Sequence, residues 1–307
     1  MSADAGHGRP QLPGTDAPLA AGELVLLLDR KGRRYLVTLE PGQEWHSHAG
    51  VVAHDELIGV LEGSSVRTGR GMEVTVLRPT REDFVLKMKR GAQVVYPKDQ
   101  AMIVAAADIR PGATVVEAGA GSGALTLALL AAVGPNGHVV SFEHREDHAA
   151  VARRNVQRFL GEQPDNWRLE LGDVVDHLGE LRAHRVVLDL LEPWKVVAAA
   201  AAALPPGGIV LAYTPGVPQV MRFCDTLGED GRFGDVRTFE TLLRPWDVDG
   251  LAVRPAHRMV AHTAFLTTAR RFPATAEGGP RRRRRKSDAF GRIDWAASDA
   301  TRPTDGQ

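Results

Sequence analysis

The sequence predicts an α/β protein built on a doubly wound, mostly parallel sheet, with a small β-rich domain before it. Two observations predict this fold. From about residue 97, apolar runs of strand length alternate with helical segments of about 10–15 residues, which is the pattern of βαβ units. Before residue 80, short β-rich runs follow one another without a long helical pattern. With 43% hydrophobic and 25% charged residues, the 307-residue chain can bury a core in both parts.

The β-rich domain is expected over residues 22–80. Runs 22–30 and 33–40 flank Lys31-Gly32, and a glycine between two β-rich runs is typical of a hairpin turn. A third run, 73–77, follows a glycine-rich turn. Because no long helical pattern interrupts these runs, we expect them to form a small β-rich domain.

The doubly wound domain is expected over residues 81–272, with strands and helices in alternation. The expected strands are 114–117, 138–143, 167–171, 185–189 and 208–213, with later β-like runs at 234–243 and 261–269 completing the sheet edge. The expected helices are 98–108, 123–133, 146–160, 194–204 and 217–228.

The two ends of the chain are expected to be disordered tails, over residues 1–21 and 273–307, because both are rich in Gly, Pro and Ala with little periodicity. Residues 280–307 hold eight basic residues and four aspartates, a net charge of +4, and the rest of the chain is −4. The run Arg281–Lys286 suits phosphate binding, although such runs are usually solvated.

Composition also bounds the cellular setting. The single cysteine, Cys224, excludes an intramolecular disulfide and a cysteine-based zinc cluster, so the chain fits a reducing compartment such as the cytoplasm. Two charge-free stretches, 118–142 and 196–221, are interrupted by glycines and prolines. Neither offers the roughly 20 apolar helical residues that a bilayer requires, so we expect a soluble protein without a membrane span.

The most informative stretch is Glu117-x-Gly119-x-Gly121-x-Gly123, which follows a predicted strand and opens a predicted helix. Glycines let the backbone turn sharply and approach a ligand closely in front of a helix N-terminus. Two ligand classes fit. Gly119-x-Gly121-x-x-Ala124 satisfies the dinucleotide fingerprint, and the loop with its leading Glu117 satisfies the glycine loop of class I S-adenosylmethionine methyltransferases. The glycines alone do not decide between them.

Acidic residues end the strands that follow. Glu143, twenty residues beyond Gly123, is expected to hold a ribose diol with either ligand. Asp173 ends the next strand and could meet an adenine amino group or cap a helix. Asp189 ends the fourth strand near the expected switch point of the sheet, and Pro193-Trp194 follows it. This arrangement resembles the Asp/Asn-Pro-Pro-aromatic element of methyltransferases that act on nitrogen. The alternative is that Asp189 caps a helix and Trp194 fills the core.

Four motifs occur in a fixed order: Tyr96-Pro-Lys-Asp99, Glu117-Ala-Gly-Ala-Gly-Ser-Gly123, Asp189-Leu-Leu-Glu-Pro-Trp194 and His262-Thr-Ala-Phe-Leu266. Together with His46-Ser-His48-Ala-Gly50, they resemble the tRNA (adenine-58-N1)-methyltransferase family in its prokaryotic homotetrameric form, over about residues 22–270. The resemblance implies the class I methyltransferase (Rossmann-like) fold, S-adenosylmethionine as cofactor, and methylation of N1 of an adenine in the tRNA T-loop.

The resemblance also implies roles for individual residues. Asp189 would be the catalytic acidic residue. The cofactor-binding residues would be Glu117, Gly119, Gly121, Ser122, Gly123, Ala124, Leu125, Glu143, His148, Asp173 and Asp189. The substrate-binding residues would be Tyr96, Trp194, Tyr213, His48 and His262. The family's loop usually carries Thr and Arg where this sequence has Ser47 and Ala49, which weakens the case for a tRNA contact at position 49.

Two other functions compete with this interpretation. An NAD-dependent oxidoreductase would share the glycine loop and Glu143, but it would need a relay such as Tyr-x-x-x-Lys, and Tyr96-Pro-Lys98 has the wrong spacing. A non-catalytic RNA-binding protein could keep the same fold. His46 and His48, with His54 nearby, could suggest a metal site, but methyl transfer from a sulfonium needs no metal and none is expected.

Overall fold

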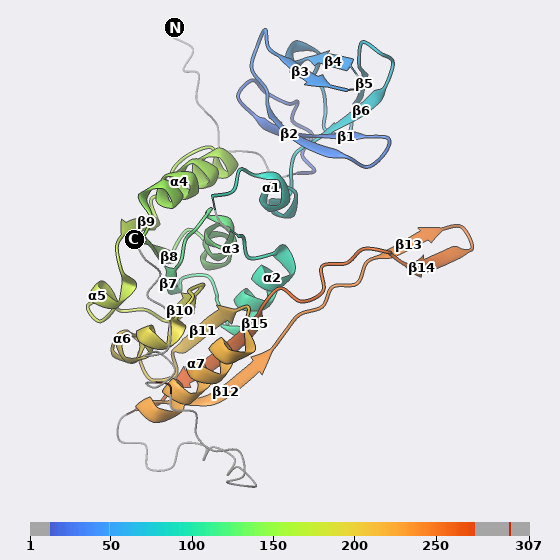
Figure 1. The fold of residues 1–307 in the computed structure, drawn as a ribbon. Helices are drawn as coiled ribbons and strands as arrows, with labels where there is room; N and C mark the ends of the chain where they lie inside the picture. The colour runs from blue at the N-terminus through green and yellow to red at the C-terminus, as the bar shows by residue number, and fades with distance from the viewer. Residues whose placement is uncertain (1–12, 49, 92, 274–294, 296–307) are drawn as a thin grey trace, which may run out of the picture.

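The computed structural model describes residues 13–48, 50–91, 93–273 and Trp295. An N-terminal β-rich domain precedes a larger α/β domain and contacts it through α1 (Arg81–Lys87), which follows the last strand of the β-rich domain (Figure 1). The fold class that the sequence predicts is confirmed.

The N-terminal domain is an antiparallel sheet of four strands in the order β2-β1-β6-β5. These are β1 (Leu24–Asp29), β2 (Arg34–Thr38), β5 (Ser65–Arg67) and β6 (Glu73–Leu77). A separate hairpin pairs β3 (Glu44–Ser47) with β4 (Gly50–Ala53), and the 3-10 helix η1 (His54–Glu56) follows. The predicted hairpin of β1 and β2 and the strand at 73–77 are confirmed. Strands β3 to β5 were not predicted, because three or four residues are too few to show a period.

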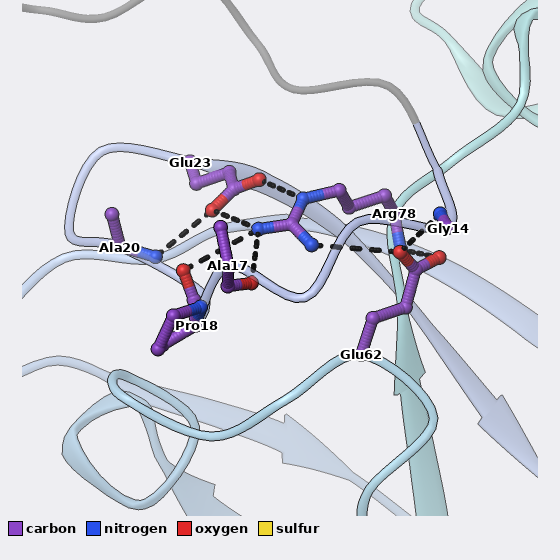
Figure 2. Close-up of polar contacts among 7 residues, drawn as sticks. All are labelled: Gly14, Ala17, Pro18, Ala20, Glu23, Glu62 and Arg78. Carbon is purple, nitrogen blue, oxygen red and sulfur yellow. Dashed lines mark hydrogen bonds and ion pairs between the residues drawn. The ribbon is translucent and has the colours of Figure 1, made fainter.

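The guanidinium of Arg78 holds the start of the chain onto this domain (Figure 2). Its side chain is 1% exposed, its Nε lies 2.5 Å from an oxygen of Glu23, and an Nη lies 3.5 Å from Glu62. It also donates to the carbonyls of Ala17 and Pro18. The prediction of a disordered segment 1–21 is therefore wrong for residues 17–21, which are tied down although their composition is that of a tail.

Residue Leu19 shows why this segment is ordered. Its side chain is buried in the core of the β-rich domain, and its N–H donates to the carbonyl of Val60 at 2.8 Å. Residues 1–12, 274–294 and 296–307, which cover most of the two predicted tails and the Arg281–Lys286 run, lie outside the described residues.

The second domain is a seven-stranded sheet in the order β12-β15-β11-β10-β7-β8-β9. Its strands are β7 (Thr114–Ala118), β8 (His138–Glu143), β9 (Trp167–Leu171), β10 (Arg185–Leu188), β11 (Ile209–Thr214), β12 (Phe233–Phe239) and β15 (Phe265–Arg271). Strands β7 to β11 pair in parallel, and β15 is antiparallel to both of its neighbours. Each strand lies within a few residues of its predicted position.

Helices cover both faces of this sheet. On one face lie α1, α2 (Pro97–Ala106), α3 (Ala124–Val133) and α4 (Glu146–Leu160), and on the other α5 (Val174–Leu178), η2 (Pro193–Val196), α6 (Val197–Ala203) and α7 (Val217–Asp230). Consecutive residues of a strand point to opposite faces of the sheet and pack in different hydrophobic cores. Val115 and Val187 pack in the core beneath α1 to α4, and Val116 and Val186 pack in the core beneath α5 to α7. This alternation explains why the strands read as continuous apolar runs. The predicted helix 194–204 begins as a 3-10 turn, and α1 and α5 were not predicted.

Between β12 and β15 the chain leaves the domain as a long arm, which ends in the hairpin of β13 (Trp246–Asp249) and β14 (Ala252–Pro255) (Figure 1). Its apolar side chains are turned to solvent: Trp246 is 57% exposed, Val248 72% and Val253 56%. The sequence analysis placed edge strands on either side of this segment and did not predict the arm. No helix in the described part of the chain is long and apolar enough to cross a membrane.

Candidate active site

The candidate site lies where the strand order reverses, between β7 and β10. At that point the Asp189 N–H donates to the carbonyl of Ala118 at 2.8 Å, which brings the carboxyl ends of the two strands together. Open α/β sheets bind ligands at such a switch point. A cavity of about 580 Å³ opens there. Its lining residues are Gln93, Gly119, Gly121, Glu143, His144, His148, Asp173, Val175, Asp189, Leu190, Leu191, Glu192, Lys195 and Val196.

The glycine loop is shaped by close backbone packing. Gly119 has φ +90°, and a Cβ there would lie 2.2 Å from the carbonyl oxygen of Asp189. Gly123, with φ +79°, opens α3, and a Cβ there would come within 3.2 Å of the carbonyl oxygen of Ala152. A side chain would push the loop away from β10 or α4, so both positions require glycine.

Glu143 fastens this loop to the end of β8. Its carboxylate accepts from the N–H of Gly121 at 2.8 Å and from the N–H of Arg145 at 3.1 Å, and the side chain lines the cavity. Two carboxylate oxygens offer about four acceptor positions, so capacity remains for a diol. The predicted place of Glu143, at a strand end beside the glycine loop, is what the structure shows.

Glu117 lies beneath the loop and is fully buried. One of its oxygens accepts from the hydroxyls of Thr126 at 2.7 Å and Ser141 at 2.5 Å. The other oxygen has no hydrogen-bond partner among the described residues. Burial raises the pKa of Glu117 to about 7, and the nearby charge of Glu143 adds to the effect.

Asp189 faces the same cavity from the end of β10. Burial raises the pKa of its carboxyl to about 7, and the carboxylates of Glu117 and Glu143 raise it further. In the described part of the chain, none of the three carboxylates forms an ion pair with a cation. The charge of Arg145 interacts favourably with that of Glu143. Burial and like charge disfavour ionisation of Glu117 and Asp189, so a cationic ligand would lower the cost of ionising these two groups.

The other predicted cofactor residues divide into two groups. Asp173 and His148 line the cavity. Asp173 also caps α5 by accepting from the N–H of Val175 at 2.9 Å, and its contact with an adenine amino group stays a prediction. Ser122, Ala124 and Leu125 are buried. The Ser122 hydroxyl accepts from the N–H of Gly91, and the side chains of Ala124 and Leu125 pack in the core, so only their backbone groups can face a ligand.

Two of the predicted substrate residues come together beside the site. Tyr213, at the end of β11, is 8% exposed and close enough to both Asp189 and Tyr96 for their charges to affect it. Burial raises the pKa of its hydroxyl, so Tyr213 is a neutral phenol. Tyr96 precedes α2 and lines a second cavity of about 300 Å³, whose other walls include Leu86 and the arm residues Leu243 and Met259.

Tyr213 and the other predicted substrate residues, Trp194, His48 and His262, line neither cavity. Trp194 is buried in the core, where the guanidinium of Arg222 lies 4.4 Å from its ring, so the prediction that this ring is free to stack on a base is wrong. The apolar surroundings of η2 decide this, and they are not visible in the local motif.

His262 bonds Glu240 at 2.8 Å and the carbonyl of Pro215 at 3.1 Å, which joins the base of the arm to the loop after β11. His48 is exposed at the turn between β3 and β4. His54 accepts from the N–H of Glu40, and no group of histidine, cysteine or acidic residues in the described segments could hold a metal ion.

Lys98 and Asp99 belong to the motif that contains Tyr96, and no separate role was predicted for either of them. The Lys98 ammonium lies 2.8 Å from the buried Asp99 carboxylate, inside the domain. Gln93, His144 and Lys195, which line the cavity, were also not predicted. The signal for the Lys98–Asp99 pair was its place in the motif with Tyr96, and no signal in the sequence marks the other three.

Comparison with known proteins agrees with this site. A family model described as the tRNA methyltransferase complex GCD14 subunit matches residues 73–252, and one described as TrmI-like N-terminal matches residues 18–66. The tRNA (adenine(58)-N(1))-methyltransferase TrmI of Thermus thermophilus is 44% identical over 252 residues, which cover 82% of this chain and 98% of that protein. The chain belongs to the tRNA (adenine-58-N1)-methyltransferase family.

Other members and solved structures extend the likeness. A tRNA (adenine(57)-N(1)/adenine(58)-N(1))-methyltransferase of Methanocaldococcus jannaschii is 35% identical and covers 80% of this chain and 94% of its own. The tRNA (m1A58) methyltransferase TrmI of Aquifex aeolicus superposes with a TM-score of 0.73 at 30% identity, covering 84% of this chain and 100% of that one. A SAM-dependent O-methyltransferase of Thermotoga maritima gives 0.80 at 31% identity, covering 84% and 96%. These findings support the predicted methyltransferase and not the oxidoreductase.

Proposed function

We propose that this protein transfers a methyl group from S-adenosylmethionine to N1 of the adenine at position 58 in the T-loop of tRNA. The observation that carries the proposal is Asp189, a half-buried carboxyl group that lines the cavity at the switch point, near the glycine loop and Tyr213. Family membership supplies the reaction, and this geometry supplies a residue able to perform it.

The residues present fit this cofactor. A Cβ at Gly119 would fill the space between the loop and β10, Glu143 keeps acceptor capacity at the strand end, and Glu117 has a buried oxygen without a partner among the described residues. Glu143 would hold the ribose hydroxyls, Asp173 would face the adenine, and His148 would lie beside them. The bound cofactor would supply an activated methyl group on a cationic sulfur, which suits a cavity lined by the carboxyl groups of Glu143 and Asp189.

Asp189 contributes to the reaction by orientation and charge. N1 of neutral adenine already carries a lone pair, so no base is needed to create the nucleophile. The ring becomes cationic as the methyl group arrives. A carboxylate that accepts from the exocyclic amino group would orient N1 and stabilise the growing charge, more strongly in the transition state than in the ground state. Tyr96 and Tyr213 would enclose the base, which their rings suit.

We infer a homotetramer, the form that the family resemblance implies, in which the hairpin β13–β14 packs on other subunits. The exposed side chains of Trp246, Val248 and Val253 support such packing, and the arm that carries them projects from the domain (Figure 1). Replacing the three with Ser should lower the mass measured by light scattering. The matched control is Leu61→Ser, at a 52% exposed leucine of the β-rich domain. A wild-type protein that runs as a monomer would contradict the assignment. A tRNA substrate would place the protein in the cytoplasm.

The function is tested by incubating the protein with an unmodified tRNA transcript and labelled S-adenosylmethionine, and then mapping the methylated position. The expected product carries label at adenine 58, and a matched transcript with another base at that position stays unlabelled. Label at an oxygen atom, or labelling that does not depend on position 58, would refute the proposal.

A further inference from the structure

One side chain, that of Gln219, joins the loops that follow β10 and β11. The two strands pair in parallel, with Leu188 beside Ala212, so their carboxyl ends leave the sheet side by side. Asp189 and the segment 190–192, which line the large cavity, follow β10. A short loop and then α7, which carries Gln219, follow β11. The side chain therefore connects two segments that leave the sheet beside the proposed methyl-transfer site.

Gln219 is the third residue of α7, and it uses both ends of its amide. The amide oxygen accepts from the N–H of Gly216, the residue that precedes the helix, at 2.9 Å. The amide nitrogen donates to the carbonyl of Leu191 at 2.9 Å. Only one orientation of the amide satisfies both partners, because a backbone N–H can only donate and a carbonyl can only accept. The first bond caps α7, and the second crosses to the loop after β10.

Gly216 leaves the space that this arrangement needs. A Cβ at residue 216 would lie 2.9 Å from the side-chain oxygen of Gln219, which is closer than the two atoms can approach without a shift. Any other residue at position 216 would push the amide away from the start of α7. Glycine at 216 and glutamine at 219 are thus matched to one another.

The segment that Gln219 reaches has few other contacts to hold its backbone. Among the residues that the structure describes, the bond from Gln219 is the one hydrogen bond made by the backbone of Leu190 and Leu191. The side chain of Leu191 is 79% exposed, and that of Leu190 packs against the core beneath α5 to α7. Asp189 immediately precedes these two residues. A backbone free to rotate at 190–191 would leave the direction of the Asp189 carboxyl group poorly defined.

We propose that Gln219 is a positioning residue for methyl transfer: its amide holds the carbonyl of Leu191 and thereby keeps Asp189 and the segment 190–192 in place at the cavity. The proposal rests on the function proposed above, in which Asp189 orients the adenine. Gln219 itself lines neither cavity, so it acts on the reaction through the loop after β10. The effect on rate should be measurable, because small displacements of a group that orients a substrate are costly.

The test compares Gln219→Glu with Gln219→Met in the full-length protein. A glutamate at the third position of a helix still accepts from the N–H of Gly216, and its charge suits the helix N-terminus. It cannot donate to Leu191, so two oxygens would face each other without a hydrogen between them. Met has a similar length and loses both bonds. The thermal midpoint should therefore fall in the Met variant and not in the Glu variant.

Activity should follow the bond to Leu191 and not the helix cap. The single-turnover rate with saturating tRNA and S-adenosylmethionine should fall by on the order of tenfold in both variants, because both lose this bond. The affinity for S-adenosylmethionine, measured by titration calorimetry, should fall much less than the rate. The matched control is Gln157→Glu, at an exposed glutamine of α4 that lines neither cavity, and it should react at the wild-type rate.

A double-mutant cycle with Asp189→Ala shows whether the effect passes through Asp189. When the Asp189 side chain is absent, Gln219→Glu should change the rate by less than about twofold. Multiplicative losses in the double variant would overturn the proposal, and so would a loss of cofactor affinity as large as the loss of rate. A slow Met variant beside a Glu variant of normal rate would also overturn it, because the cap of α7 would then account for the effect.

The outcomes keep the two proposals apart. A wild-type protein that does not methylate tRNA removes the proposed function itself. A wild-type protein that methylates adenine 58, with a Gln219→Glu variant equally fast, leaves the function standing and removes the positioning role. If Gln219→Glu does not fold, Gln219→Met enters the same cycle, and unfolding of both would make the side chain structural and also remove that role.

Discussion

Two buried charged centres in this protein differ in one respect, the presence of a counter-charge. In the β-rich domain, Arg78 is surrounded by the carboxylates of Glu23 and Glu62 and by two backbone carbonyls (Figure 2). In the α/β domain, Glu117, Glu143 and Asp189 converge without a cation within ion-pair distance among the described residues, and the pKa values of Glu117 and Asp189 rise to about 7. The first centre is electrostatically complete and the second is not.

The difference indicates what each centre is for. A buried ion pair with all its hydrogen bonds made fixes one arrangement of the chain, here the docking of residues 17–20 onto the β-rich domain. A group of carboxylates that the protein leaves uncompensated raises the free energy of the empty site, and a cationic ligand relieves that cost. In the β-rich domain, complete charge pairing thus stabilises one arrangement of the chain. In the α/β domain, incomplete charge pairing leaves the site able to bind a cation.

The largest effect is expected at the complete centre. Arg78→Met leaves Glu23 and Glu62 without their counter-charge, which should lower the free energy of unfolding by about 3–5 kcal/mol. The matched control is Arg30→Met, whose partner Glu73 is at the surface and whose arginine is 74% exposed, with an expected loss of about 0–1 kcal/mol. Chemical denaturation followed by circular dichroism measures both. Equal losses in the two variants would show that burial does not distinguish the pairs.

At the incomplete centre, Asp189→Asn should fold and bind tRNA normally. We expect it to lose on the order of 10²–10³ in kcat, because it keeps the shape and an acceptor oxygen but removes the charge. Single-turnover rates with saturating tRNA and S-adenosylmethionine isolate the chemical step. An Asn variant within about threefold of wild type would refute an electrostatic role, since that gap is below about 1 kcal/mol.

A smaller effect is expected at Glu143, where Ala substitution removes the acceptor proposed for the ribose hydroxyls. The affinity for S-adenosylmethionine should fall by about 1.5–3 kcal/mol, the value of hydrogen bonds to a charged group. Titration calorimetry measures it. Asp147→Ala is the control, since this exposed carboxylate pairs with Arg145 and lines neither cavity. Unchanged affinity in the Glu143 variant would show that the ribose is held elsewhere.

The smallest effect concerns pH and stability without cofactor. The pKa of Asp189 is raised on folding, so the folded state holds a proton that the unfolded state has released. That contribution to stability is fully present below about pH 4 and is lost as pH rises through about 7. Asn does not titrate, so the Asp189→Asn variant does not lose this stability as the pH rises. The thermal midpoint of the variant minus that of the wild type should therefore increase between pH 6 and pH 8.

Asp173→Asn is the control for this experiment, because its carboxylate is 44% exposed at the mouth of the same cavity. Its midpoint relative to wild type should change little over the same range. A difference between Asp189→Asn and wild type that stays constant from pH 6 to pH 8 would show that Asp189 is already ionised in the folded protein.

The sequence by itself determined the fold class, the order of the strands along the chain, the glycine loop and the strand-end acids Glu143, Asp173 and Asp189. These features follow from local rules: the period of apolar residues, the backbone freedom of glycine, and the position of an acidic residue directly after an apolar strand. Family resemblance added the reaction, and the comparisons confirmed it.

Only the tertiary structure decided what lies between distant segments. Arg78 reaches Glu23 and Ala17, Thr263 meets Lys98 and Asp99, and Trp194 is covered by the core although its motif predicted a ring beside the base. Each of these contacts joins residues tens to more than a hundred positions apart. The spacing of apolar residues along the sequence does not predict such a contact, because the packing of whole helices and strands decides which side chains become hydrogen-bond and charge partners.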